Sequence, residues 1–95
     1  MSGVEIYTGL FCSYCDRAKE ILDRKGVAYT EIDVSTNVTK LRELARRSGG
    51  RMSVPQIFIG DSYIGGYKEL AALERSGKLD TLIAGTPLAE PRREG

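Results

Sequence analysis

The sequence predicts a single α/β domain, because strands and helices alternate along a chain of only 95 residues. Residues 4–34 show a strand, a helix and a second strand, a unit with parallel strands and a right-handed crossover. Residues 56–64 show a β-hairpin, and helices with an apolar stripe precede and follow it. We expect residues 1–84 to form the domain and residues 85–95, which have no hydrophobic period, to form a flexible tail.

The first strand is predicted at residues 4–7, where apolar residues alternate with polar or amphipathic ones. A loop at Thr8 and Gly9 leads into a helix that ends at Gly26. The apolar face of this helix consists of Cys15, Ala18, Ile21 and Leu22. Cys12 therefore lies at the N-terminus of the helix.

The second strand is predicted at residues 27–34, and three candidate N-caps follow it at residues 35–37. The second helix begins there and ends at Gly49 and Gly50. Its polar side carries Lys40, Arg42, Arg46 and Arg47, with Arg51 just beyond the glycines. We expect most of these cations to be solvated and one or two to meet a carboxylate of a small anionic substrate.

A hairpin is predicted from the strand at residues 56–59, the turn at 60–62 and the residues Tyr63 and Ile64. Pro55 cannot donate to a strand ladder, so it marks an edge or a turn. It would leave the backbone of Val54 free to pair with an extended ligand, although an ordinary proline at the start of a strand explains it as well.

Gly65 and Gly66 precede a predicted helix with an apolar stripe at Leu70 and Leu73. Two glycines at a helix N-terminus form either a simple turn or a place where an anion approaches the backbone. Ser76 and Gly77 end this helix. A short amphipathic helix then packs back on the core through Leu79, Leu82 and Ile83.

Cys12 and Cys15 are the only cysteines, and they lie one helical turn apart. The unpaired N–H groups and the positive dipole end of the first turn favour an anion. We therefore expect the pKa of Cys12 to fall from about 8.5 into the range of about 3.5 to 7.5 seen at such sites. Cys15 lies on the same helix face, close enough to bridge. The pair predicts redox chemistry in which Cys12 attacks and Cys15 resolves.

Three other interpretations of the cysteine pair are weaker. A strand-to-helix junction is a poor place to bury two structural cysteines. A zinc site usually needs four ligands, and two cysteines without any histidine cannot supply them from this chain without carboxylates or a second chain. A structural disulfide that closes so short a loop would constrain the unfolded chain little.

Fourteen Lys and Arg against thirteen Asp and Glu give a net charge of +1, which indicates neither a nucleic-acid footprint nor an acidic tail. The first three residues lead straight into a strand without a secretory signal, and no apolar run approaches the length of a spanning helix. We expect a cytoplasmic, soluble protein that binds no nucleic acid and no membrane. A redox pair in place of a disulfide framework agrees with a reducing compartment.

Three motifs resemble those of a bacterial glutaredoxin: Cys-Ser-Tyr-Cys at residues 12–15, Ser-Val-Pro at 53–55 and Gly-Gly at 65–66. The resemblance covers residues 3–84 and implies a thioredoxin-like α/β fold, a four-stranded mixed sheet flanked by helices in the order βαβαββα. It implies Pro55 in the cis form. It further implies a glutathione-dependent thiol–disulfide oxidoreductase that uses glutathione as reductant and acts on glutathionylated and disulfide-containing proteins.

The resemblance also implies residue roles. Cys12 would form a mixed disulfide with glutathione, and Cys15 would resolve the intermediate when the substrate is a protein disulfide. The implied glutathione-binding residues are Tyr14, Arg46, Val54, Pro55, Gly66, Tyr67 and Lys68. Among them, residues 66–68 would offer backbone N–H groups to the γ-glutamyl carboxylate, the Val54 backbone would pair with the cysteinyl unit, and Arg46 would lie near the glycyl carboxylate.

Three positions differ from the commonest form of the family. Ser13 stands where proline is usual, and its N–H and hydroxyl are expected to stabilise the Cys12 thiolate further. Gly9 and Lys68 stand where many relatives carry a lysine and an aspartate. We expect glutathione binding to persist, with Glu69 as the substitute carboxylate and a larger share of the binding from Arg46 and the backbone.

Two other functions stay open at this point. Some glutaredoxins with a small residue in place of that proline hold a [2Fe–2S] cluster in a dimer, with one cysteine thiolate and one glutathione from each monomer. Cys12 would be the ligand here, and we expect a monomer when no cluster is bound. Reduction by a flavin-dependent thioredoxin reductase, in place of glutathione, also agrees with the cysteine pair.

Overall fold

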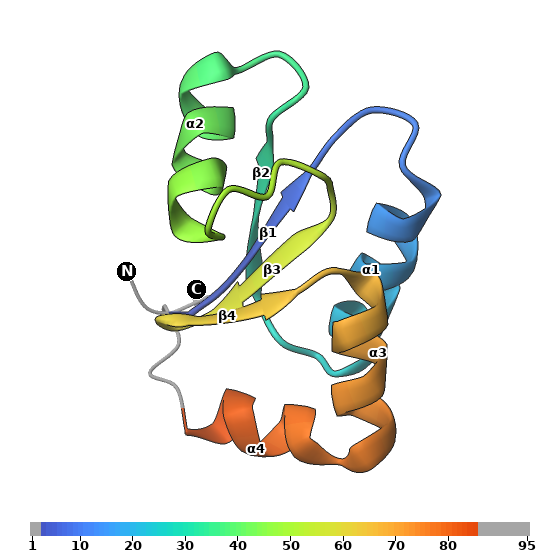
Figure 1. The fold of residues 1–95 in the computed structure, drawn as a ribbon. Coiled ribbons are helices and arrows are strands. Elements are labelled where there is room, and N and C mark those ends of the chain that lie inside the picture. The colour runs from blue at the N-terminus through green and yellow to red at the C-terminus, as the bar shows by residue number, and fades with distance from the viewer. Residues whose placement is uncertain (1–2, 86–95) are drawn as a thin grey trace.

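The computed structural model describes residues 3–85, which form a sheet of four strands covered by helices on both faces (Figure 1). The elements are β1 (Val4–Thr8), α1 (Ser13–Arg24), β2 (Tyr29–Asp33), α2 (Val38–Arg47), β3 (Gln56–Ile59), β4 (Ser62–Gly65), α3 (Tyr67–Ser76) and α4 (Lys78–Ala84). The fold class predicted from the sequence is confirmed, with the short final helix as an eighth element. The predicted domain limit at residue 84 stays a prediction, and its tail lies outside the described residues from residue 86 on.

The sheet has the order β2-β1-β3-β4 and is mixed. β1 pairs in parallel with β2, as the strand–helix–strand unit requires, and β3 pairs antiparallel with both β1 and β4. The second strand is shorter than the predicted 27–34 because its ladder with β1 runs only from the Val4–Tyr29 pair to the Thr8–Asp33 pair. The five residues of β1 therefore set the length of β2.

The two faces of the sheet have separate hydrophobic cores because β1 and β3 are covered on both sides. Val4 and Ile6 point into a cluster with Leu22 and Leu70 of the helices α1 and α3. Tyr7 points to the opposite face, in a cluster with Leu44 of α2. In Figure 1, α2 accordingly lies on one side of the sheet and α1 and α3 on the other.

The helix ends follow local sequence signals. Of the three candidate N-caps, Asn37 caps α2, and its side-chain oxygen accepts the N–H of Lys40 at 3.0 Å. Gly77 ends α3 in the left-handed conformation with φ +81°. Both predicted helix boundaries are thereby confirmed.

Arg47 departs from the expected solvated cationic face of α2. Its guanidinium turns toward the sheet and donates to Glu5 Oε1 and to the Tyr7 hydroxyl, each at 2.8 Å. It also lies 4.0 Å from the ring centre of Phe58. Burial would lower the pKa of Arg47, but the hydrogen bonds to Tyr7 and Glu5 outweigh it and raise the pKa above its ordinary value. Arg46, one residue earlier, is exposed as expected.

Candidate active site

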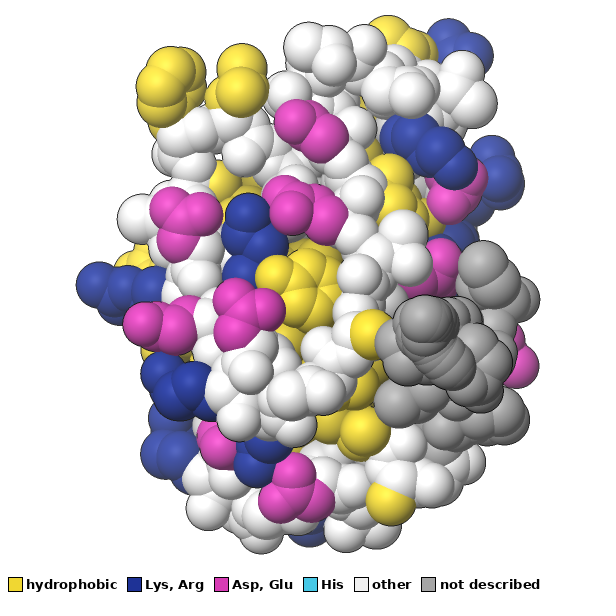
Figure 2. Space-filling model, turned by 180° about the vertical axis from the view of Figure 1, so that it is seen from behind, with side chains coloured by type: hydrophobic (Ala, Val, Ile, Leu, Met, Phe, Trp, Pro, Cys, Tyr) yellow, Lys and Arg dark blue, Asp and Glu magenta, His cyan; other side chains and the backbone are white. Residues whose placement is uncertain are grey.

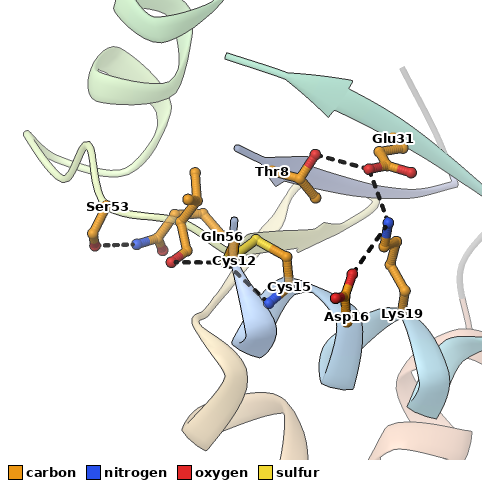
Figure 3. The surroundings of a disulfide bond; sticks show 9 residues. Thr8, Cys12, Cys15, Asp16, Lys19, Glu31, Ser53 and Gln56 are labelled. Carbon is orange, nitrogen blue, oxygen red and sulfur yellow. Dashed lines mark hydrogen bonds and ion pairs between the residues drawn. A yellow bond between two sulfur atoms is a disulfide. The ribbon is translucent and has the colours of Figure 1, made fainter. Parts of the chain in front are cut away.

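Cys12 and Cys15 lie at the start of α1 and are joined in a disulfide (Figure 3). Cys12 is the N-cap, its sulfur accepts the Cys15 N–H at 3.1 Å, and the Cα atoms are 5.2 Å apart. Cys12 is half-buried, whereas only 2% of Cys15 is exposed. An incoming sulfur nucleophile can therefore reach Cys12 and cannot reach Cys15 without a movement of the chain.

The segment before β3 lies against the reactive pair. The Sγ atom of Cys12 is 3.8 Å from the carbonyl oxygen of Val54. The Val54–Pro55 peptide bond is cis, as the resemblance implied. Pro55 is buried, and Val54 is half-buried beside the disulfide.

A groove of about 270 Å³ runs beside the pair and joins three segments of the chain. Its lining consists of Tyr14, Arg51, Ser53, Val54, Pro55, Gln56, Gly66, Tyr67, Lys68 and Glu69. Six of the seven predicted glutathione-binding residues line it, and the exception is Arg46. Arg51 lines the groove in its place, because it follows Gly49 and Gly50 after α2 and belongs to the segment leading to Ser53.

The two glycines before α3 allow close packing at the groove. Gly65 has φ +116°, and a Cβ atom there would lie 2.9 Å from Cγ of Glu69. A Cβ atom on Gly66 would lie 3.3 Å from the carbonyl oxygen of Pro55. Gly65 and Gly66 therefore do more than turn the chain, since they bring the start of α3 against the Pro55 segment.

Glu69 caps α3 from within the first turn. Its Oε1 atom accepts the N–H of Gly66 at 2.8 Å. This backbone hydrogen bond holds the pKa of Glu69 below its usual value. The N–H of Gly66 is thus used by the Glu69 carboxylate. The N–H groups of Tyr67 and Lys68, which have no acceptor within the helix, are the first-turn donors left for a ligand.

Gln56 fixes the loop in front of the disulfide, a role that the sequence did not reveal. Its side chain is almost fully buried, and its Nε2 atom donates to Ser53 Oγ at 3.1 Å (Figure 3). Its Oε1 atom accepts from the Tyr63 hydroxyl at 2.6 Å. Both polar ends of a buried amide are therefore satisfied by groups on neighbouring segments. The only sequence signal is a polar residue in an otherwise apolar strand.

The glutaredoxin family model matches residues 4–64, a span that includes the cysteine pair and the Pro55 segment. The chain belongs to the glutaredoxin family. The glutaredoxin of Pseudomonas aeruginosa is 49% identical over 84 residues, which cover 88% of this chain and 99% of that protein. Glutaredoxin 3 of Escherichia coli is 48% identical over 83 residues, 87% of this chain and 99% of that protein.

Solved glutaredoxin structures are similar to this one. The solution structure of the glutaredoxin from Brucella melitensis has a TM-score of 0.74 at 49% identity and covers 87% of this chain and 89% of that one. The crystal structure of a buckwheat glutaredoxin–glutathione complex has a TM-score of 0.76 at 27% identity, with coverages of 85% and 76%. The thioredoxin-like fold implied by the resemblance is confirmed.

This glutaredoxin is a thiol–disulfide oxidoreductase with a dithiol active site, since the family match coincides with a Cys12–Cys15 disulfide. These findings favour glutathione-dependent redox activity over the alternative of a cluster-binding dimer. Within residues 3–85, no helix is long and apolar enough to span a membrane. Over the same residues, no group of three or more His, Cys, Asp or Glu side chains is placed to hold a metal ion.

The cap formed by Glu69 predicts a pH-dependent stability. Because the pKa of Glu69 is lower in the folded than in the unfolded chain, its contribution is present above the unfolded pKa and is lost as the pH falls through the folded pKa. We expect Glu69→Gln to lower the free energy of unfolding at pH 7 by about 0.5 kcal/mol. The effect is small because Glu69 is exposed and solvent weakens its interaction with the helix N-terminus. The difference should be smaller at pH 3 than at pH 7 in urea titrations. Glu20→Gln, which removes an exposed carboxylate paired with Arg24, is the matched control. A constant deficit at both pH values would contradict the prediction.

Proposed function

We propose that this glutaredoxin carries electrons from glutathione to two classes of substrate, glutathionylated proteins and protein disulfides. The observation that carries the proposal is the unequal exposure of the pair, with Cys12 accessible and Cys15 buried behind it. Cys12 alone acts on the first class, and both cysteines act on the second. A reducing compartment such as the cytoplasm supplies the reduced glutathione that both reactions consume, and the protein acts there as a monomer.

In the monothiol reaction, the Cys12 thiolate attacks the glutathione sulfur of a glutathionylated protein. A bond forms between Cys12 and glutathione, the substrate disulfide breaks, and the protein thiolate leaves and takes a proton from solvent. The thiolate of a second glutathione then attacks the glutathione bound to Cys12. Glutathione disulfide is released, and the Cys12 thiolate returns.

In the dithiol reaction, the Cys12 thiolate attacks one sulfur of a protein disulfide and releases the other as a thiolate. The sulfur of Cys15, after losing its proton, attacks Cys12 Sγ and releases the second substrate thiolate. The enzyme is left with the Cys12–Cys15 disulfide found in this structure. Two glutathione molecules return it to the dithiol and leave as glutathione disulfide.

We infer that glutathione binds in the groove beside Cys12. The Val54 backbone offers a strand-like edge, and the rings of Tyr14 and Tyr67 lie 5.6 Å apart at the groove. The start of α3 offers the Tyr67 and Lys68 N–H groups to a carboxylate. The glutathione complex of the buckwheat neighbour supports this assignment.

A mixed disulfide provides the direct test of the groove. Cys15→Ser would be converted to the Cys12–glutathione disulfide, and its backbone amide NMR shifts compared with those of the reduced variant. We expect the largest changes at Val54, Tyr67 and Lys68. Changes confined to the far end of α1, near Arg24, would overturn the assignment.

Arg51 and Arg46 are the two candidate partners of the glycyl carboxylate of glutathione, and they can be compared directly because Arg51 lines the groove and Arg46 does not. We expect Arg51→Ala to raise the KM for glutathione about fivefold, as for one exposed charge-assisted contact, and Arg46→Ala to change it less than about twofold. Steady-state assays with a small glutathione mixed disulfide measure both. A larger rise in the KM for glutathione in Arg46→Ala than in Arg51→Ala would show that Arg46, as the family resemblance implies, binds the glycyl carboxylate.

Ser13 allows a test of the thiolate. It is the first residue of α1, so its N–H is among the first-turn donors that have no acceptor within the helix. We expect Ser13→Pro to raise the pKa of Cys12, because proline removes one N–H and the hydroxyl together. Proline is well tolerated at this helix position, so the variant should fold. The pKa of Cys12 is measured from the ultraviolet absorbance of its thiolate as a function of pH. Both proteins carry Cys15→Ser, so that Cys12 is the only thiol. An equal or lower pKa of Cys12 in the proline variant would refute the hypothesis.

A further inference from the structure

Leu10 and Phe11 are the two residues directly before Cys12, and both side chains stand in solvent. Leu10 is 64% exposed and Phe11 is 102% exposed. The backbone of Phe11 has φ +51°, and among residues 3–85 it is the only residue other than glycine with a positive φ. In Figure 2, hydrophobic side chains project at the upper left of the molecule, the side on which the loop between β1 and α1 lies.

Neither feature helps the fold. The left-handed region is unfavourable for a bulky side chain because Cβ approaches the following carbonyl oxygen. A fully exposed aromatic ring gains nothing from burial. A strained, exposed aromatic residue beside a nucleophile is typical of a position maintained for function.

Exposed apolar side chains gather around the reactive pair. Six large hydrophobic residues are exposed in the described chain, and four of them lie within two residues of Cys12 or Val54. These four are Leu10, Phe11, Tyr14 and Met52. Residues 8–15 carry no charged side chain, so the loop itself offers a partner no ionic contact, and nearby charges include those of Arg17, which lies over the Tyr14 ring, and of Arg51. A partner segment that matches this loop would therefore carry apolar side chains.

We propose that Leu10 and Phe11 form a docking element for protein disulfides whose cysteines are flanked by apolar side chains. The inference rests on the proposed dithiol reaction and adds a substrate preference to it. In the mixed disulfide, the Cβ atoms of Cys12 and of the substrate cysteine are about 4 Å apart. Consecutive Cα atoms are about 3.8 Å apart, so the substrate residues beside that cysteine reach Phe11.

The test compares two synthetic peptides that each contain one intramolecular disulfide in the same ring, flanked by Leu and Phe in one and by Ser in the other. The reduced full-length protein is mixed with each peptide in single turnover, and the peptide thiols formed are quantified. We expect the wild type to reduce the apolar peptide about tenfold faster, the factor expected for burying part of one large apolar side chain.

Phe11→Asn is the variant of choice because asparagine tolerates a positive φ, so the loop keeps its conformation while the ring is lost. We expect the preference to fall below about twofold in Phe11→Asn combined with Leu10→Ser. Val38→Ser removes an apolar side chain on α2 that is about as exposed as Leu10, and it should keep the wild-type preference. Turnover of 2-hydroxyethyl disulfide with glutathione should be the same in all three proteins.

An unchanged preference in the double variant would overturn the docking element. So would an equal loss of activity toward 2-hydroxyethyl disulfide, because the two residues would then serve the reaction itself. A wild-type dimer in sedimentation that dissociates in Phe11→Asn, with the peptide preference unchanged, would show that a second copy covers the surface instead. Inactive wild type in the glutathione-coupled assay would refute the proposed function alone, since the single-turnover comparison uses no glutathione.

Discussion

Cys12→Ser is expected to lose glutathione-coupled turnover by at least about a thousandfold, because a serine hydroxyl stays protonated near neutral pH and is no nucleophile toward sulfur. Cys15→Ser should keep activity toward a small glutathione mixed disulfide within about threefold, since the monothiol reaction does not use Cys15. The same variant should fail to reduce a protein disulfide to completion and should accumulate a mixed disulfide at Cys12.

The measurement is steady-state oxidation of glutathione with both substrates, together with mass spectrometry of the trapped intermediate. The two single variants are each other's control, because each removes one sulfur atom from the same disulfide. Equal losses in both variants with the small substrate would contradict the assignment of Cys12 as the sole attacking sulfur. A mixed disulfide trapped on Cys15 in Cys12→Ser would contradict the burial argument.

The sequence predicted the parts of the fold that depend on local signals. A helix N-cap within residues 35–37, the helix end at Gly77 and the placement of Cys12 ahead of α1 all follow from preferences within a few residues of chain, although only the structure shows that Asn37 is the cap. The parallel pairing of β1 and β2 followed from the strand–helix–strand order. The pairing register did not, and so the second strand was predicted too long.

The direction of long side chains could not be predicted in the same way. Arg46 and Arg47 are neighbours with the same chemistry, yet Arg46 faces solvent and Arg47 lies against the sheet. Neighbouring positions on a helix differ by about 100°, so the packing angle of α2 on the sheet decides which arginine is inside. Arg51 lines the groove because of the loop path after Gly50, which no local pattern specifies.

Arg47→Ala is expected to lower the free energy of unfolding by about 2 to 3 kcal/mol, the largest stability effect among the charged residues discussed. The side chain of Glu5 is only 11% exposed, so its carboxylate would be left charged and nearly buried without its partner. Tyr7 would lose a hydrogen-bond donor, and Phe58 would lose the guanidinium packed on its ring. Because Arg47 is itself partly exposed, the loss of stability should be smaller than for a fully buried ion pair.

Arg46→Ala is the matched control, because it removes the same side chain from the next residue of α2, where it is exposed. Surface substitutions of this kind change stability by about 0.5 kcal/mol or less, so the two variants should differ clearly in thermal unfolding. For a domain of this size, the Arg47 variant should melt roughly 10 to 20 °C lower. Equal melting temperatures for the two variants would show that the Glu5–Arg47 pair adds nothing to stability.

A second substitution separates the orphaned charge from the lost packing. If the unpaired carboxylate causes most of the loss, then adding Glu5→Gln to Arg47→Ala should recover about half of the lost stability, because the buried charge disappears. If packing on Phe58 dominates, Arg47→Met should recover more than Glu5→Gln, since its side chain can cover the ring without a charge. We expect Glu5→Gln to recover more stability than Arg47→Met. The half-buried Arg47 guanidinium lies 2.8 Å from the Glu5 carboxylate, so most of the loss should come from the unpaired charge.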